Sequence, residues 1–583
     1  MRACLLALLL PAAALPLWAS DASTFLSADE ERISTLDPAA IYDRQSLAVA
    51  LNIFEPLVIF GTDPVKPSFL PFLSAEVPSR ENGLLSEDGL SYAFPIRKGV
   101  RFHDGSELTP EDVRYSLLRF LLQDREGGPA GILLKPILGV YSTRGPDGKI
   151  AVRWEDAAGA LRVEGGKVVI RLREPCAPFL SILASWPFIL SKKWAAEHGD
   201  WDGEEATWKA FNNPDYRKSY LRFHADGTGP FLLDASSAAA NLVVLRRNEA
   251  YWRGPARLNT LVFHQVDSEL TRLSMLRTGD ADCAVLSRAA LQDVADAPGI
   301  EVLDDQPGSS IGAAVFFTFQ AESRDNPALG SGRLDGAGIP PDFFKDPDVR
   351  RGFAFAFDYE RFLRQALRGK GERAEGPLPM KAFGLTPGKP AYEHDRAQAE
   401  RLLRKAWGGL LWQKGFKAEI AFNANDATAR AAAEILSSEL REIRPSFSLT
   451  PKPEWKSTLD KDVLRHRPPV FLSGFEADYP DLHSYAFSLL HSAGLYPKAQ
   501  RYSNPKADEL VESAARSLAE GERERAYGAL QALYKDEVPQ IYLYYPVNFK
   551  VVRSGLAGLR PERRRLDPFN LHNALYFYRV RKD

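Results

Sequence analysis

The sequence predicts an α/β fold, because strand-like segments alternate with segments that carry helix signals. Strand-like segments occur at 167–172, 242–246 and 261–266. Helix-capping residues stand before other segments, as Asp395 and Asn504 do. At 583 residues the chain is too long for one ordinary core, so we expect several domains.

The N-terminal segment predicts a secretory signal peptide over residues 1–22. Arg2 precedes an apolar run at 3–10, and small residues follow. The run is shorter than the roughly 20 residues that a membrane-spanning helix needs. Cys4 lies at the start of this run and not at its end, so we expect no lipid-anchor motif and a soluble mature protein.

The segment 92–120 predicts a strand, turns and a capped helix in close succession. Residues 92–96 alternate between apolar and other side chains, and Pro95 favours an edge position because it has no N–H to donate. Thr109 is a suitable N-cap, and Pro110 suits the first helical position. We interpret this segment as architecture and not as a catalytic site.

Later elements follow the same logic. Alanine-rich residues 427–443 predict a helix, and further helices are expected from Asp395 through Ala406 and after Asn504. Residues 313–319 predict a strand. Gly, Asp and Pro cluster over 330–341, which predicts a surface loop.

The charge balance excludes several classes of function. The chain has 74 Lys and Arg against 76 Asp and Glu, a net charge of −2, and no basic block. Nucleic-acid binding needs a concentrated basic surface, so we expect none, and a polybasic membrane anchor is equally disfavoured. No metal-ligand spacing and no phosphate loop occurs, so we expect neither metal nor cofactor. Cys176 and Cys283 allow one disulfide, although unpaired thiols are the more usual outcome.

An enzyme is the competing class. Residues 308–312 satisfy the G-x-S-x-G pattern of a nucleophile elbow, with Ser310 as its serine. That motif requires a helix after the serine, whereas 313–319 predicts a strand. We therefore expect no catalytic residue, and a secreted hydrolase remains a distant alternative.

A series of motifs resembles the family 5 extracellular solute-binding proteins, which are the peptide-binding components of bacterial ABC importers. Segment 92–120 resembles that family's signature almost residue for residue. Further matching motifs follow in the family's order, at 35–38, 227–231, 247–252, 276–282, 348–351, 356–358, 474–481 and 502–505. The resemblance covers nearly the whole chain after the leader.

The resemblance implies a two-lobed periplasmic-binding-protein fold of type II, with an additional subdomain and a hinge between the lobes. The expected divisions are lobe I at 23–70, 181–310 and 544–583, the subdomain at 71–180, and lobe II at 311–543. The chain is expected to cross between lobes near 308–319 and to return near 541–552.

The resemblance also implies a ligand site. Asp478 occupies the position of the aspartate that receives a peptide's α-ammonium in the family, which is chemically sensible because an enclosed amine needs a carboxylate. The other candidates are aromatic residues that can pack over a ligand and an arginine that can meet its carboxylate: Phe475, Trp455, Tyr479, Tyr42 and Arg465. Leu472 stands where some relatives have an arginine, so Arg465 or Arg467 is the candidate substitute. Tyr42 stands at a position that is occupied by an acidic residue in one branch of the family.

The implied function is a monomeric periplasmic receptor that captures a peptide or peptide-like solute and delivers it to a permease with ATPase subunits. Two alternatives stay open within the family. One is a non-peptide cargo such as a nickel chelate, a glycan or a modified peptide. The other is a sensor that differs only in its partners.

Overall fold

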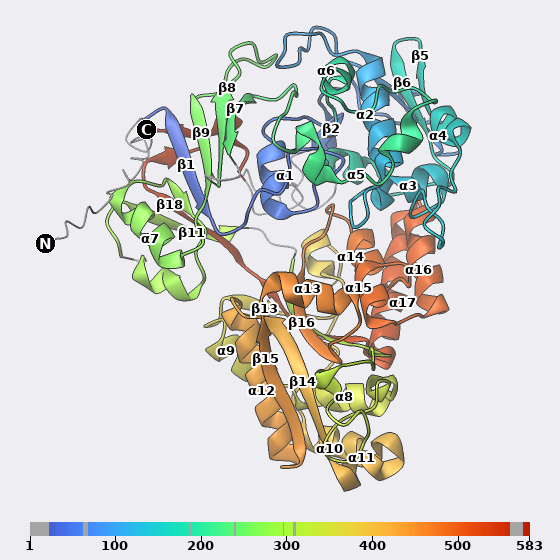
Figure 1. The fold of residues 1–583 in the computed structure, drawn as a ribbon, viewed down its shortest axis with the longest axis vertical. Helices are drawn as coiled ribbons and strands as arrows, with labels where there is room; N and C mark the ends of the chain where they lie inside the picture. Colours follow the sequence, from blue (N-terminus) through green and yellow to red (C-terminus); the bar gives the residue numbers. More distant parts are fainter. Residues whose placement is uncertain are drawn as a thin grey trace, which may run out of the picture.

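The computed structural model describes most of the chain after the leader: residues 22–61, 68–186, 188–237, 241–294, 296–306, 310–386, 388–559 and 575–583. The predicted signal peptide, apart from Ala22, lies outside these residues. Figure 1 shows two lobes joined by a narrow connection. Among the described helices, none is long and apolar enough to cross a membrane.

Lobe I is built on a mixed seven-stranded sheet with the order β11-β18-β10-β1-β9-β8-β7. Its strands are β1 (Thr24–Asp29), β7 (Phe231–Ser237), β8 (Leu242–Arg247), β9 (Thr260–Gln265), β10 (Cys283–Ala284), β11 (Ile300–Gln306) and β18 (Asn548–Arg553). The central strand β1 runs parallel to β9 and β10, and the other pairs are antiparallel. Helices α1 (Arg44–Ala50) and α7 (Glu269–Thr278) lie beside the sheet (Figure 1).

The subdomain of lobe I contains a three-stranded antiparallel sheet, with β4 (Ser91–Pro95), β6 (Lys167–Arg171) and β5 (Leu161–Glu164) in that order. Strand β4 lies at the edge of this sheet, which confirms the edge position predicted from Pro95. Helices α2 (Pro110–Gln123), α3 (Gly131–Leu138) and α4 (Trp154–Ala160) fall within the subdomain's expected bounds of 71–180, and α5 (Phe179–Ser185) and α6 (Lys192–Glu197) extend past the expected boundary at 180. Thr109 caps α2 in a reciprocal capping box with Asp112, as Ser/Thr caps commonly do.

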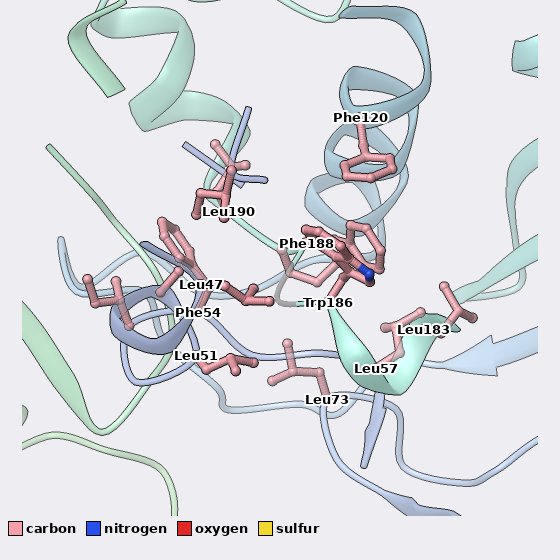
Figure 2. Close-up of a cluster of buried hydrophobic side chains, with 14 of the residues drawn as sticks. Leu47, Leu51, Phe54, Leu57, Leu73, Phe120, Leu183, Trp186, Phe188 and Leu190 are labelled. Carbon is pink, nitrogen blue, oxygen red and sulfur yellow. The ribbon is translucent and has the colours of Figure 1, made fainter. Parts of the chain in front are cut away.

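The subdomain shares one hydrophobic core with the rest of lobe I. Figure 2 shows Leu47 and Leu51 of α1 near Phe120 of α2 and Leu183 of α5, with Trp186 between them. All five side chains are buried in the same cluster. The short pair β2 (Val58–Phe60) and β3 (Phe69–Pro71) adjoins it. Each large side chain buried in this core contributes about 1.5–3 kcal/mol to stability. The shared core therefore stabilises the packing of the subdomain against the rest of the lobe.

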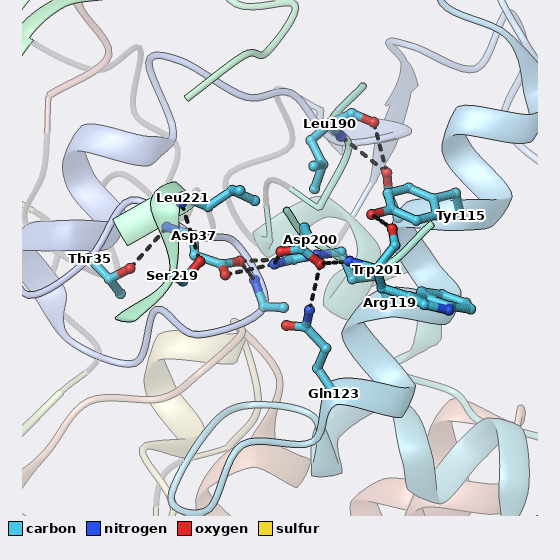
Figure 3. Close-up of polar contacts among 12 residues, drawn as sticks. Thr35, Asp37, Tyr115, Arg119, Gln123, Leu190, Asp200, Trp201, Ser219 and Leu221 are labelled. Atoms are coloured by element: carbon cyan, nitrogen blue, oxygen red, sulfur yellow. Dashed lines mark hydrogen bonds and ion pairs between the residues drawn. The ribbon is translucent and has the colours of Figure 1, made fainter. Parts of the chain in front are cut away.

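A buried ion-pair cluster ties the N-terminal segment to α2 (Figure 3). The Arg119 guanidinium, 1% exposed, donates two hydrogen bonds to Asp37, at 2.6 and 2.7 Å. It donates two more to Asp200, at 2.6 and 3.1 Å. Two bidentate carboxylates use the planar fork of arginine fully. Two motifs of the family resemblance, at 35–38 and 92–120, therefore meet here in a structural role.

Lobe II is built on a mixed six-stranded sheet with the order β13-β17-β12-β16-β14-β15. Its strands are β12 (Ile311–Phe317), β13 (Gly371–Arg373), β14 (Phe416–Asn423), β15 (Phe447–Glu454), β16 (Val470–Phe475) and β17 (Gln540–Pro546). Its helices are α8 (Pro347–Ala356), α9 (Tyr359–Gln365), α10 (Arg396–Lys405), α11 (Leu410–Lys414), α12 (Ala427–Ile443), α13 (Lys456–Leu464), α14 (Leu482–Leu490), α15 (Leu495–Gln500), α16 (Pro505–Arg516) and α17 (Glu520–Glu537).

Both faces of this sheet are buried, which explains why β12 reads as a continuous apolar run. Val315 and Phe317 pack into the core on the side of α8 and α12. Ala314 and Phe316 pack into a second core, which includes residues of α14, α16 and α17. Because successive side chains of a strand point to opposite faces, β12 contributes side chains to both cores.

Two short connections join the lobes. The chain leaves the seven-stranded sheet after β11 and enters the six-stranded sheet at β12; it returns between β17 and β18, at Val547. The proposed boundary at 543/544 falls within β17. Asp304 of β11 contacts Arg288 at 2.8 Å and Lys370 at 2.7 Å, so an ion-pair network spans the connection.

Most elements expected from the sequence are present. The 313–319 prediction corresponds to β12, and α10, α12 and α16 begin at the expected caps or starts. Ser310 lies immediately before β12, so no helix follows it, contrary to the requirement of a nucleophile elbow. Cys176 and Cys283 are both buried and free, so no disulfide joins them.

Candidate functional site

A cavity of about 750 Å³ lies between the two lobes. Lobe I contributes Tyr42, the loop 124–129 after α2, and residues of α3. Lobe II contributes residues of α13 and α14 and the segment 471–474 of β16. In Figure 1, α13 to α16 form the end of lobe II that faces α1 and α3. The volume is in the range of small-molecule and peptide pockets.

The sheet of lobe II places functional side chains at this cavity. Strands β14 and β16 are parallel neighbours, so their carboxyl ends meet at one edge. Asn423 and Asp426 come from the end of β14, and Asp478 and Tyr479 follow β16. Ligands of open α/β sheets commonly bind at such an edge.

Asp478 is half-buried in the wall of the cavity. The Tyr42 hydroxyl, from the opposite lobe, donates a hydrogen bond to its Oδ2 at 3.3 Å. The Asp478 backbone N–H donates to Ser484 Oγ at 3.0 Å, which fixes the loop to α14. Burial raises the pKa of the carboxyl to about 6, although the Tyr42 hydrogen bond lowers it in part. A long neutral hydrogen bond compensates this carboxylate poorly, so a cation would stabilise it.

Aromatic rings line the same wall at helical spacing. Tyr479, His483 and Phe487 follow one another with nearly parallel planes, at centroid separations of 6.3 and 5.9 Å. The Tyr479 hydroxyl is hydrogen-bonded to His483 Nδ1 at 2.6 Å. Burial lowers the pKa of His483 to about 4, so its imidazole is neutral at pH 7. Tyr141 of lobe I stacks on Phe487 at 5.0 Å and closes this side of the cavity.

An ion-pair network crosses the cavity between α3 and α16. Lys135 Nζ lies 3.6 Å from both Glu174 and Glu512, and Arg516 lies 3.4 Å from Glu174. The Ala177 backbone N–H also donates to the carbonyl of Ala515 at 2.8 Å. The subdomain and lobe II are therefore in direct contact, as in a closed arrangement of the lobes.

The structure brings three of the six candidate residues to the cavity: Tyr42, Asp478 and Tyr479. The other three do not line it. Phe475 is buried in the core of lobe II against Tyr485, Trp455 is 68% exposed before α13, and Arg465 is exposed after α13.

Several cavity residues were missed at the sequence level. His483 and Phe487 lie on α14, and their spacing of four from Tyr479 was a readable signal. Tyr141 and Arg125 come from lobe I, hundreds of positions away, and no local pattern marks them. Within the part of the chain that the structure describes, no group of three or more His, Cys, Asp or Glu is placed to hold a metal ion.

Two lobes on separate sheets, two short connections and a charged, ring-lined cavity between them define a two-lobed ligand-binding protein. Residues 81–497 match the bacterial extracellular solute-binding proteins, family 5. The chain belongs to that family.

Relatives of known name differ in what they bind. The chain is 24% identical to heme-binding protein A of Haemophilus influenzae, over 92% of this chain and 90% of the relative. It is 24% identical to the glutathione-binding protein GsiB of an Escherichia coli strain, over 88% of this chain and 86% of the relative.

Solved structures share the fold. One is a dipeptide-binding protein of Pseudoalteromonas in complex with Met-Leu, with a TM-score of 0.71, 22% identity, and coverage of 96% of this chain and 100% of the other. Another is NikZ of Campylobacter jejuni in complex with Ni(L-His), with a TM-score of 0.70, 20% identity, and the same coverage.

Proposed function

We propose that this protein is a periplasmic receptor that captures a peptide or peptide-like solute with a free amino group between its lobes. The observation that carries the proposal is the Asp478 carboxylate in the wall of the interlobe cavity. Among the described residues, Tyr42 is the one side chain hydrogen-bonded to that carboxylate. A ligand ammonium would supply the positive charge that the site lacks.

The rest of the cavity suits a ligand of variable side chains. The rings of Tyr42, Tyr141, Tyr479, Phe487 and Tyr496 present flat surfaces that pack against apolar groups without demanding particular hydrogen bonds. Water in the remaining volume would bridge polar ligand groups and tolerate variation.

Closure of the lobes would couple ligand binding to transport. The ligand adds contacts to both walls, so it binds the closed state better and shifts the population of lobe arrangements toward it. The contacts of Lys135 and Tyr141 with lobe II stabilise the same state. A membrane permease with separate ATPase subunits would recognise the closed form and take up the solute.

The proposed setting follows from the family and the N-terminal segment. Residues 1–22 direct export to the periplasm, where the protein acts as a monomer without cofactor. It carries out no covalent chemistry. The position of Ser310 before a strand supports a binding role over hydrolysis.

A second candidate function is capture of a bulky non-peptide solute. Its support is the ring-lined wall at Tyr479, His483 and Phe487, together with one relative named for heme and a structure that holds a nickel chelate. A flat cargo would use the rings and would leave Asp478 without an ammonium partner.

A thermal-shift screen separates the two candidates. Short peptides, their N-acetylated forms, heme and Ni(L-His) are compared on the purified protein. Ligand at about a hundred times its dissociation constant adds roughly 2.7 kcal/mol to stability. The proposal expects peptides to raise the melting temperature and N-acetylation to abolish the rise. A rise with heme or the chelate alone supports the second candidate.

A further inference from the structure

The subdomain of lobe I contacts lobe II at a place away from the two connections between the lobes. In Figure 1, α3 and α16 meet on the right, whereas the connections lie toward β11 and β18 on the left. The Ala177 backbone N–H donates to the Ala515 carbonyl at 2.8 Å, and a Cβ on Gly89 would lie 2.9 Å from Leu518 Cδ1. Opening of the lobes about the connections would therefore break this contact.

Four charged side chains at this contact form a closed ring of alternating sign, which we call the charge ring: Lys135 and Glu174 on the subdomain, and Glu512 and Arg516 on α16. Two of its ion pairs cross between the lobes, Lys135–Glu512 at 3.6 Å and Arg516–Glu174 at 3.4 Å. The other two lie within one lobe, Lys135–Glu174 at 3.6 Å and Arg516–Glu512 at 3.5 Å. Each charge thus has one partner in its own lobe and one in the other lobe.

The pairs within each lobe decide what opening costs. When the lobes separate, every charge of the ring keeps the partner on its own side, so the open state leaves none of the four unpaired. The four side chains are 26–42% exposed, so closing removes little of their hydration. The two crossing pairs are therefore a gain of the closed state, and each exposed pair shifts the closed-to-open ratio by a factor of about 1.4 to 5.

Aromatic packing adds to the charge ring. The Tyr141 ring stacks on Phe487 at 5.0 Å and contacts His491 at 5.7 Å, and the Lys135 ammonium lies 5.1 Å from the centre of the same ring. His491 Nε2 lies 3.4 Å from Glu512. Burial lowers the pKa of His491, so its imidazole is neutral at pH 7 and does not compete with Lys135 as a cation.

We propose that the charge ring and the Tyr141 stack hold the lobes closed without ligand, so that the empty protein is mainly in the closed state. The inference goes beyond the proposed function and does not depend on which solute is bound. A solute would then enter only while the lobes are open, so the strength of this contact would limit the rate of association.

The test is small-angle scattering of the mature protein, after unfolding in urea and refolding to remove any co-purified solute. Lys135→Glu combined with Glu174→Lys keeps the net charge and the pair within the subdomain, but it makes both crossing contacts repulsive. At low salt the wild type should match the closed form. The double variant should have a larger radius of gyration, with a closed-to-open ratio about tenfold lower. At 1 M salt the two proteins should converge, because screening removes both attraction and repulsion.

Reversal of the charges on α16 repeats the test from the other lobe. Glu512→Lys combined with Arg516→Glu should expand the protein in the same way. The fourfold variant that joins both reversals alternates in sign again, so it should recover most of the compactness of the wild type. Asp147→Lys with Lys149→Glu swaps an exposed ion pair of the subdomain and is the matched control, which should leave the radius of gyration unchanged.

Other outcomes overturn the inference. An open wild type at low salt without ligand contradicts it, and so does a radius of gyration that both double variants leave unchanged. A fourfold variant that stays as expanded as the double variants shows that the alternation of charge is not what closes the lobes. Melting temperatures close to that of the wild type show that each variant is folded.

Discussion

Ligand affinity should fall as the pH drops below about 6, because Asp478 must be ionised to accept an ammonium. Burial raises the pKa of this carboxyl to about 6 in the unliganded protein. A bound ammonium favours the ionised carboxylate, so the pKa of Asp478 is lower in the complex than in the unliganded protein. The binding energy from this charge is therefore fully present above pH 6 and is lost as the pH falls toward the pKa of the complex.

The magnitude follows from the protonated fraction. At pH 5 about nine in ten carboxyls with a pKa near 6 are protonated, so affinity should be roughly tenfold weaker than at pH 7.5. Binding at pH 5 should also release close to one proton per ligand. Asp478→Asn keeps the shape and removes the charge. It should cost about 1.5–3 kcal/mol at pH 7.5, the range of hydrogen bonds to charged groups, and should flatten the pH profile.

Calorimetry with the best peptide of the screen, in buffers of different ionisation enthalpy, measures both affinity and proton release. Glu476→Gln is the matched control, because partial desolvation also raises the pKa of that neighbouring carboxyl, whose side chain is exposed and lies outside the cavity lining. It should leave the profile unchanged. A wild-type affinity that is equal at pH 5 and 7.5, or a fall that persists in Asp478→Asn, would refute the reasoning.

Three further predictions concern closure, stability and chemistry. Glu512→Gln removes the partly exposed ion pair between Glu512 and Lys135 across the cavity. Ligand affinity should therefore weaken severalfold at low salt and match the wild type at 1 M salt, because screening already removes such a pair; a loss independent of salt would contradict this. Arg119→Leu leaves Asp37 and Asp200 buried and unpaired, so urea unfolding should show a loss of about 3–5 kcal/mol, and a loss below about 1 kcal/mol would be inconsistent with the cluster. The wild type and Ser310→Ala should bind peptide equally, and neither should show esterase or peptidase turnover. Turnover in the wild type that is lost in Ser310→Ala would restore the hydrolase alternative.

Local signals in the sequence anticipated much of the fold. The cap at Thr109, the apolar run of β12 and the helix at Ala427–Ile443 depend on neighbours within a few turns, and each is present. The family motifs also have structural partners: the backbone N–H of Gly227 donates to His103 Nδ1, and a Cβ on Gly227 would lie 2.2 Å from the carbonyl oxygen of Ile53. Such close approach requires glycine.

The cavity was only partly predictable, because it is assembled from both lobes. Phe475 keeps the alternation of β16, because it packs in the same core as Phe471. Phe471 lines the cavity and Phe475 does not, and only the packing of the folded chain decides which residue of this face is covered. Phe475 packs inward. Arg125 belongs to a loop whose partner, Ala40, lies in a distant segment, and only the folded chain brings the two together.

Native mass spectrometry of the protein purified from the cells that produce it tests the central claim most directly, since a ligand enclosed between two lobes often survives isolation. The account predicts a co-purified solute that fragments as a short peptide with a free N-terminus, and its loss from Asp478→Asn. An adduct without amide fragments, retained equally by Asp478→Asn, would contradict it.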